Sequence, residues 1–369
     1  MHSKELSSAL ERAGRVVVKI GTSNLTGDNM LSERKVAGIV ERVIRLKSGG
    51  REVIIVSSGA IAAGMSALKL KERPRDVKLL QATAAVGQNE LMRVYGKLFS
   101  SRRQAIAQIL LTYEDFENRK RYLNLRNTVN TLLKMGVIPI INENDTIAVD
   151  EIKFGDNDNL SALVAVNLNA DLLILVSSAG LHAGDPKKDK NAPLIPLVTE
   201  LTKDIEECAG KSTALGSGGM KTKLEAARKA TEAGITLIIT SLGKDALVSE
   251  DSTVFKAGAK LSDREHWIRH TSKPAGRLVV DDGARNALAE TGCSLLPSGV
   301  LKVEGAFKAG DTVSITDKNR VEIGRGLSNY SSAEAEKLKG KKTSEMVKTT
   351  GHAGPREIVS RRNMVLNTR

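Results

Sequence analysis

The chain has 369 residues, 41% of them hydrophobic and 27% charged, a composition typical of a globular protein large enough for two domains. No apolar run approaches the roughly 20 residues that span a bilayer. The two cysteines, Cys208 and Cys293, have neither metal-ligand spacing nor the number needed for a disulfide framework. The formal net charge of +13 suits an anionic substrate or a polyanionic partner.

The N-terminal stretch MHSKELSSALERAG mixes acidic and basic residues before any apolar segment. That order is typical of neither a secretory signal nor a transit peptide. Together with the scarcity of cysteine, it leads us to expect a cytoplasmic protein.

Residues 1–257 alternate short apolar runs with longer amphipathic stretches. The runs predict strands over 15–20, 52–57, 105–111, 137–141, 171–177 and 236–240. Helices are expected over about 33–47, in Ala- and Leu-rich segments that end near 99, and in a segment that ends near 135. Two more are expected, one starting near 158 and one over about 220–233. Such alternation predicts an α/β domain with a mostly parallel sheet covered on both faces.

From residue 277 the pattern changes to short strands separated by glycine-rich turns. We expect a linker over 258–276, a small β-rich domain over 277–355 and a basic tail over 356–369. Residues 337–369 hold nine Lys and Arg against two Glu, which is typical of a solvated basic end or of contact with RNA.

Two polar clusters follow apolar elements of the first domain, INENDT at 141–146 and FGDNDN at 154–159. Asp, Asn and Ser are ordinary helix caps, but a cap needs only one such residue. Because parallel sheets bind ligands beyond the carboxyl ends of their strands, both clusters are candidate site segments.

Three glycine-containing strand ends or loops indicate a phosphorylated ligand. Lys19 is followed by Gly21, Ser57-Ser58-Gly59 follows the second strand, and Gly216–Met220 precedes a helix bearing Lys221 and Lys223. The chain lacks a P-loop and a dinucleotide-binding glycine motif. No histidine stands in a recognisable hydrolase setting, and no His/Cys cluster indicates zinc.

Four segments carry a family resemblance: VVVKIGTSNLT, VSSGAIAAGM, PIINENDTIAVDEIKFGDNDNLSALVA and GSGGMKTKLEAA. In this order they resemble the glutamate 5-kinases of the amino-acid kinase family, and the β-rich C-terminal segment resembles a PUA domain. The resemblance implies a three-layer α/β sandwich that uses ATP to convert L-glutamate into L-glutamyl 5-phosphate, the first step of proline synthesis. It also implies Mg²⁺, inhibition by proline, a homo-oligomer (dimer or tetramer) and transfer of the product to glutamyl phosphate reductase.

The resemblance also implies residue roles. Lys19 and Lys223 would stabilise the transferring phosphoryl group, and Asp156 would orient both lysines. Asp145 and Asp158 would accept from the substrate ammonium, Ser58 and Asn157 would donate to its carboxylates, and Asn142 would lie beside them. The nucleotide would contact Lys19, Gly21, Ser177, Ser217, Gly218, Gly219, Met220, Lys221, Thr222 and Lys223. The chain has Val176-Ser177 where the family usually has Thr-Asp.

Two alternatives stay open at this point. Another amino-acid kinase, of the acetylglutamate, aspartate or carbamate type, would share Lys19, Lys223 and Asp156. An RNA-binding protein would use the PUA-like domain and the basic tail. The segment from Asn142 to Asp145 and the appended domain favour the glutamate 5-kinases.

Overall fold

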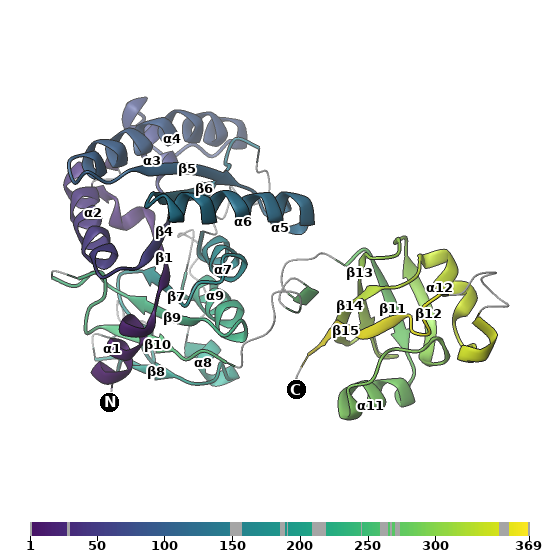
Figure 1. The fold of residues 1–369 in the computed structure, drawn as a ribbon. Helices are drawn as coiled ribbons and strands as arrows, with labels where there is room; N and C mark the ends of the chain where they lie inside the picture. Colours follow the sequence, from purple (N-terminus) through teal and green to yellow (C-terminus); the bar gives the residue numbers. More distant parts are fainter. Residues whose placement is uncertain are drawn as a thin grey trace. The chain divides into compact units, whose positions relative to one another are not determined.

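The structure is a computed structural model. It describes residues 2–27, 30–147, 157–184, 189, 191–208, 219–244, 246–258, 265, 268–269, 274–346 and 354–367. The chain divides into two compact units, Met1–Lys260 and Leu261–Arg369, coloured purple to green and green to yellow in Figure 1.

The N-terminal unit is built on an eight-stranded sheet in the order β5-β6-β4-β1-β7-β9-β10-β8. The strands are β1 (Arg15–Ile20), β4 (Glu52–Ser57), β5 (Ile106–Leu111), β6 (Ile138–Glu143), β7 (Leu172–Val176), β8 (Leu197–Val198), β9 (Thr236–Thr240) and β10 (Ser252–Phe255). The strands from β5 to β9 in this order run parallel, and β10 pairs antiparallel with β9. Outside the sheet, β2 (Thr26–Gly27) and β3 (Met30–Leu31) form a short hairpin.

Helices cover both faces of this sheet (Figure 1). One layer contains α1 (His2–Arg12), α2 (Glu33–Ser48), α3 (Ala60–Ala67) and α4 (Val77–Ser100), and the other contains α5 (Glu114–Glu117), α6 (Arg119–Lys134), α7 (Asn157–Asn167), α8 (Lys203–Cys208) and α9 (Met220–Glu232). The three layers confirm the predicted α/β class. Strands β8 and β10, which continue the sheet beyond β9, were not predicted, because strands of two and four residues show little periodicity.

Strand alternation decides which side chains of β1 face each helical layer. Val16, Val18 and Ile20 pack in the core with α2 and α4, whereas Val17 packs in the core with α7 and α9. Since side chains alternate along a strand, Lys19 belongs to the same face as Val17. The single lysine of β1 is therefore directed toward α7 and α9.

The C-terminal unit has its own core and a five-stranded sheet in the order β12-β11-β13-β14-β15. Its elements are β11 (Gly276–Val280), α11 (Asp282–Thr291), β12 (Val300–Gly305), β13 (Thr312–Thr316), β14 (Glu322–Ser328), α12 (Ser332–Leu338) and β15 (Val359–Leu366). A separate core is the physical basis for treating this unit as a domain.

Two expected boundaries differ from the structure. The segment expected as a basic tail contains β15, which pairs with β14 and buries Val359 and Met364. Arg361 and Arg362 lie between these two apolar residues, so the sequence does not read as a strand. Within the expected linker, the units divide after Lys260, and Ile268 is buried against residues of the C-terminal sheet.

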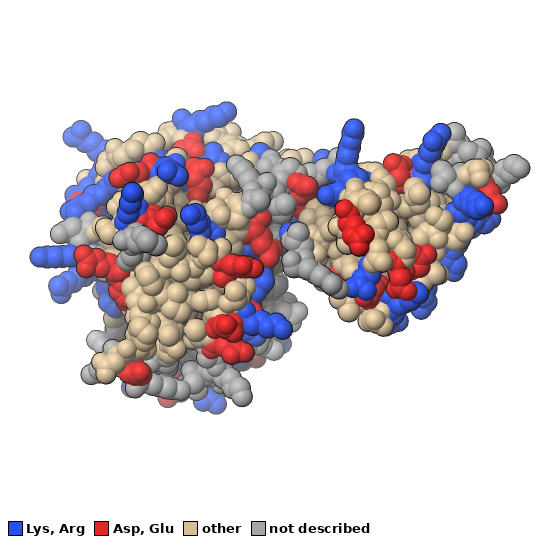
Figure 2. Space-filling view, turned by 90° about the horizontal axis from the view of Figure 1, so that it is seen from below, with Lys and Arg blue, Asp and Glu red and all other residues tan. Residues whose placement is uncertain are grey.

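Basic side chains are interspersed with acidic ones on both units in the face drawn in Figure 2. In the C-terminal unit Lys302 and Arg320 pair with Glu304, at 2.7 and 3.3 Å. Lys318 pairs with Asp282 at 2.7 Å. These three basic side chains are therefore paired with carboxylates of the same unit.

Candidate active site

The candidate site lies at the carboxyl ends of the central strands. The chain order reverses around β1, because β4 lies on one side of it and β7 on the other. Open α/β sheets bind ligands at such a switch point. Lys19 lies near the end of β1, Ser58 directly follows β4, and Asn142 is the buried next-to-last residue of β6.

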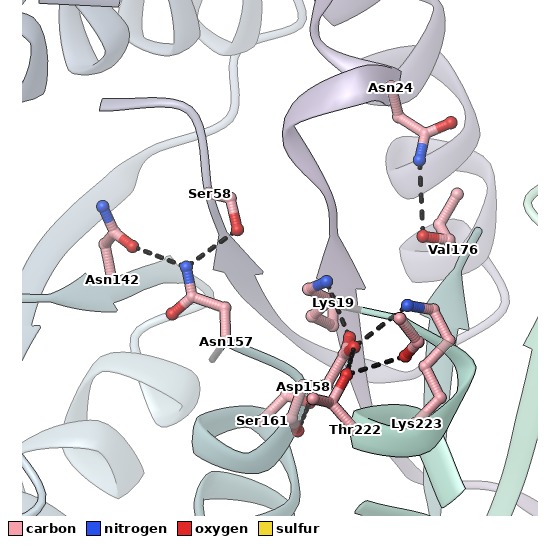
Figure 3. Close-up of polar contacts among 11 residues, drawn as sticks. Lys19, Asn24, Ser58, Asn142, Asn157, Asp158, Ser161, Val176, Thr222 and Lys223 are labelled. Carbon is pink, nitrogen blue, oxygen red and sulfur yellow. Dashed lines mark hydrogen bonds and ion pairs between the residues drawn. The ribbon is translucent and has the colours of Figure 1, made fainter. Parts of the chain in front are cut away.

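A buried carboxylate stands between two lysines at this edge (Figure 3). Asp158, in the first turn of α7, lies 2.6 Å from the Lys19 ammonium through Oδ1 and 3.0 Å from the Lys223 ammonium through Oδ2. The Thr222 hydroxyl also donates to Asp158 Oδ2, at 2.8 Å. Asp158 is 1% exposed and each lysine 6%, so water screens these pairs very little.

The ionisation of Asp158 follows from this setting. Burial raises the pKa of a carboxyl group, but the Lys19 and Lys223 ammonium groups outweigh burial and hold the pKa of Asp158 below its usual range. Asp158 is therefore a carboxylate at neutral pH. It fixes two positive charges side by side, where they would otherwise repel each other.

The contacts of Asp158 differ from the expected roles. The resemblance gave the lysine-orienting role to Asp156 and a substrate contact to Asp158, but the carboxylate found between the lysines is that of Asp158. Asp156 lies outside the described residues. Two aspartates separated by one residue look alike in sequence, and only the structure shows that Asp158, in the first turn of α7, lies between the lysines.

A row of amides extends from this carboxylate toward β4 and β6 (Figure 3). Asn157 Nδ2 donates to Ser58 Oγ at 2.8 Å and to Asn142 Oδ1 at 3.0 Å. Asn142 Nδ2 in turn donates to Gln88 Oε1 at 2.9 Å. Three of the expected substrate residues are thus brought together, and Gln88 is an addition that the sequence did not suggest.

The turn after β4 places Ser58 in this row. Gly59 has a φ of 105°, in the left-handed region that favours glycine, and caps the start of α3. The backbone N–H of Ser58 donates to Ile20 O at 3.0 Å, which ties the turn to the end of β1. A side chain at residue 59 would strain the turn that holds the Ser58 hydroxyl beside Asn157.

Asp145 follows β6 and is partly buried. Burial raises its pKa to about 6, and the positive charge of Arg73 opposes the rise. A carboxyl group with a pKa near neutrality is typical of functional sites. Its use as an ammonium acceptor stays a prediction.

The expected nucleotide residues are described only in part. Gly219 caps α9, Met220 and Lys221 begin it, and Thr222 and Lys223 reach Asp158. Gly21 follows β1, and a side chain there would come within 3.6 Å of the Lys19 ammonium, so a glycine leaves the space beside that charge open. Ser177 directly follows β7, and its N–H donates to Thr240 O at 2.7 Å. Ser217 and Gly218 lie outside the described residues.

The last polar residue of FGDNDN has a structural contact. Asn159 donates to Glu225 Oε2 at 3.2 Å and accepts from Lys229 Nζ at 2.6 Å, which ties α7 to α9. The cluster therefore serves several tasks: Asn157 joins the amide row, Asp158 holds the lysines, and Asn159 joins two helices. Glu225 and Lys229 are four residues apart, so they lie on the same face of α9. This spacing is the only feature of the sequence that indicates their shared contact with Asn159.

Within the described part of the chain, no three His, Cys, Asp or Glu side chains are grouped so that they could hold a metal ion. Both cysteines are free thiols. No described helix combines the length and apolarity required to cross a bilayer.

Comparison with known proteins identifies the family of both units. Residues 14–241 match the amino acid kinase family, and residues 276–349 match the PUA domain. The chain therefore belongs to the amino acid kinase family and carries a C-terminal PUA domain. Among solved structures, a carbamate kinase from Giardia lamblia aligns with 67% of this chain and 100% of its own, with a TM-score of 0.46 and 18% identity.

Curated relatives define the branch of the family. A glutamate 5-kinase from Geobacter sp. (strain M21) is 47% identical over 367 residues, covering 97% of this chain and 98% of the relative. One from Dictyoglomus turgidum is 46% identical, covering 96% and 98%. One from Geobacter sulfurreducens is 44% identical, covering 98% and 99%. Within the amino acid kinases, the chain belongs with the glutamate 5-kinases.

Proposed function

We propose that the protein transfers the γ-phosphoryl group of ATP to the side-chain carboxylate of L-glutamate, with Lys19 and Lys223 stabilising the transferring group. The observation that carries this proposal is the buried Lys19–Asp158–Lys223 arrangement at the carboxyl edge of the sheet. Membership of the glutamate 5-kinases supports the choice of substrate.

The attacking group needs no general base. A glutamate side chain has an unperturbed pKa of about 4.3, so its carboxylate is already ionised at neutral pH. A carboxylate oxygen forms the new bond to the γ-phosphorus, the bond to the bridging oxygen breaks, and ADP leaves with that electron pair. The barrier is the approach of an anion to a polyanionic phosphate, which positioning and positive charge lower.

Lys19 and Lys223 supply that charge, and Asp158 is a positioning residue for both. Its carboxylate holds the two ammonium groups within 3.0 Å of its oxygens. The Thr222 hydroxyl, also on Asp158, couples this position to the first turn of α9. Asp158 rather than Asp156 therefore has the lysine-orienting role in this proposal.

Magnesium is proposed to arrive with the nucleotide. Both Asp158 oxygens already contact lysines or Thr222, and no acidic cage occurs among the described residues. This fits an ion held chiefly by nucleotide phosphates, which is usual for Mg²⁺ in phosphoryl-transfer sites. When bound, the ion would neutralise part of the phosphate charge. Lys19 and Lys223 would stabilise the negative charge that remains on the transferring group.

The substrate amino acid is proposed to bind along the amide row. Ser58, Asn142 and Asn157 lie in one hydrogen-bonded line, and Asp145 follows Asn142 by three residues. Proline carries the same α-carboxylate and an ammonium group, so competition with glutamate is proposed at these contacts. A cytoplasmic location, a homo-oligomer and product transfer to glutamyl phosphate reductase are also proposed.

An assay of ADP formation with L-glutamate, N-acetylglutamate or L-aspartate tests the function. We expect Mg²⁺-dependent turnover with glutamate and capture of the acyl phosphate by hydroxylamine as a hydroxamate. Preference for N-acetylglutamate or aspartate would assign the chain to a different substrate within the family.

A further inference from the structure

The amide row at the site ends on a buried glutamine of α4 that none of the assigned roles uses. Gln88 is 9% exposed, and its Oε1 accepts a hydrogen bond from Asn142 Nδ2. Asn142 is 2% exposed and Asn157 is 5% exposed. Since these groups are shielded from water, each of their donors and acceptors needs a partner in the protein or in a ligand.

The hydrogen bonds of the row run in one direction, with Gln88 as the acceptor at its end. Amide oxygen and nitrogen are told apart by their partners. Gln88 Oε1 accepts from Asn142 Nδ2, so the other side of the Asn142 amide, Oδ1, faces Asn157. Asn157 Nδ2 donates to this oxygen. If Gln88 donated instead, both asparagines would turn over and Asn157 would present its oxygen to Asn142 and Ser58.

With this direction, the side-chain oxygen of Asn157 has no donor within the row. Asn157 Nδ2 has two hydrogens, and Asn142 and Ser58 take both. Asn157 Oδ1 is buried without a hydrogen-bond partner, and in Figure 3 no dashed line reaches it. A buried carbonyl oxygen without a donor is costly, so a ligand that supplies an N–H is expected there.

Helix packing holds Gln88 in place against this site. A Cβ on Gly87 would lie 1.7 Å from Ala60 O, and one on Gly64 would lie 1.9 Å from Thr83 O. The backbones of α3 and α4 therefore touch where they cross. Because α3 starts directly after the Ser58 turn, this contact fixes the position of Gln88 relative to the amide row.

We infer that Gln88 is a positioning residue that orients Asn142 and Asn157 so that Asn157 Oδ1 accepts a hydrogen bond from the α-ammonium group of the amino-acid substrate. This inference deepens the proposed function and rests on it. Gln88 then contributes to selecting a substrate that carries an ammonium group over a dicarboxylate that lacks one. Asn157 acts as an acceptor here, not as the carboxylate donor expected from the sequence.

The test compares L-glutamate with glutarate, which has the same two carboxylates but no ammonium group. Gln88→Met removes the acceptor at nearly constant volume. It should raise the KM for glutamate. The glutamate preference, which is the ratio of kcat/KM for glutamate to kcat/KM for glutarate, should fall about 10- to 100-fold, the scale for losing a hydrogen bond to a charged group. The kcat at saturation and the KM for ATP should change by less than about twofold, because Lys19, Asp158 and Lys223 are untouched.

Gln88→Glu tests the direction of the row. A glutamate at residue 88 accepts from Asn142 in either ionisation state, so this variant should keep most of the preference. Thr83→Val is the matched control, since Thr83 is buried on the same helix and its hydroxyl donates to Leu79 O, one turn earlier in α4, at 2.6 Å. It should leave the preference unchanged.

Equal losses with glutamate and glutarate in Gln88→Met, or equal damage in Gln88→Glu and Gln88→Met, would overturn the inference while leaving the proposed function intact. An unaltered Gln88→Met enzyme would overturn it as well. Failure of the wild-type protein to phosphorylate glutamate would instead refute the proposed function.

Discussion

Replacing Asp158 by asparagine removes one charge from the centre of the candidate site and almost no volume. The carboxylate lies 2.6 and 3.0 Å from two ammonium groups, and all three side chains are at least nine-tenths buried. Removing one partner of a buried ion pair costs about 3–5 kcal/mol, because it leaves uncompensated buried charge. For a unit of this size we expect a fall in Tm of roughly 6–20 °C, at about 2–4 °C per kcal/mol.

Catalysis and nucleotide binding should respond differently to Asp158→Asn. The lysines lose the group that holds them, so kcat should fall at least about 10²-fold, the scale for a displaced charge-stabilising donor. Their two unpaired charges still attract phosphate, so the KM for ATP should not rise. Saturating ATP should therefore raise the Tm of the variant at least as much as that of the wild type.

The pH dependence follows from the lowered pKa of Asp158. A carboxyl group with a lowered folded-state pKa stabilises the fold above its unfolded pKa of about 4, and this contribution is lost as pH falls through the folded value. The Tm difference between wild type and Asp158→Asn should be constant from about pH 5 to 8 and shrink below about pH 4. Differential scanning fluorimetry across this range measures it.

Asp171→Asn is the control for this variant. Asp171 accepts from the backbone N–H groups of Gly14 and Arg15, at 2.9 and 2.8 Å, near the amino ends of β1 and β7. Its replacement should lower Tm without changing kcat. If Asp158→Asn keeps near-normal kcat, or loses no more stability than Asp171→Asn, the assignment of a buried charge-holding role to Asp158 is refuted.

Three further predictions concern the lysines, Asp145 and the C-terminal unit. Lys19→Met and Lys223→Met should each lower kcat at least about 10²-fold in the ADP assay, and near-normal turnover would remove that lysine from the mechanism. Because the pKa of Asp145 is raised to about 6, kcat/KM for glutamate should fall as pH drops through about 6, and Asp145→Asn should abolish this dependence; an unchanged profile would show that Asp145 does not bind the ammonium group. Since every proposed site residue lies within Met1–Lys260, residues 1–260 alone should retain glutamate-dependent ADP formation; a folded but inactive truncation would show that the active site needs the PUA domain.

The sequence by itself determined the α/β class and most of the sheet. Strands β1, β4 and β9 have the predicted bounds, because long β-branched runs bounded by polar residues have few alternative structures. The glycines and lysines at strand ends also indicated a phosphate ligand, since parallel topology brings strand ends to one edge. Short elements such as β8 and β10 were missed because they contain too few residues to show a period.

Only the tertiary structure decided which polar residue does what. Asp156 and Asp158 have the same local chemistry in sequence, but the register of α7 against β1 and α9 puts Asp158 between Lys19 and Lys223. β15 was not predicted for a related reason: its apolar residues are separated by Ser360-Arg361-Arg362-Asn363, and the strand is recognised only by its pairing with β14. Gln88 lies 54 residues from Asn142, and no local pattern links them. Their contact depends on two helices crossing at backbone distance, and packing between distant segments is information that residue spacing does not contain.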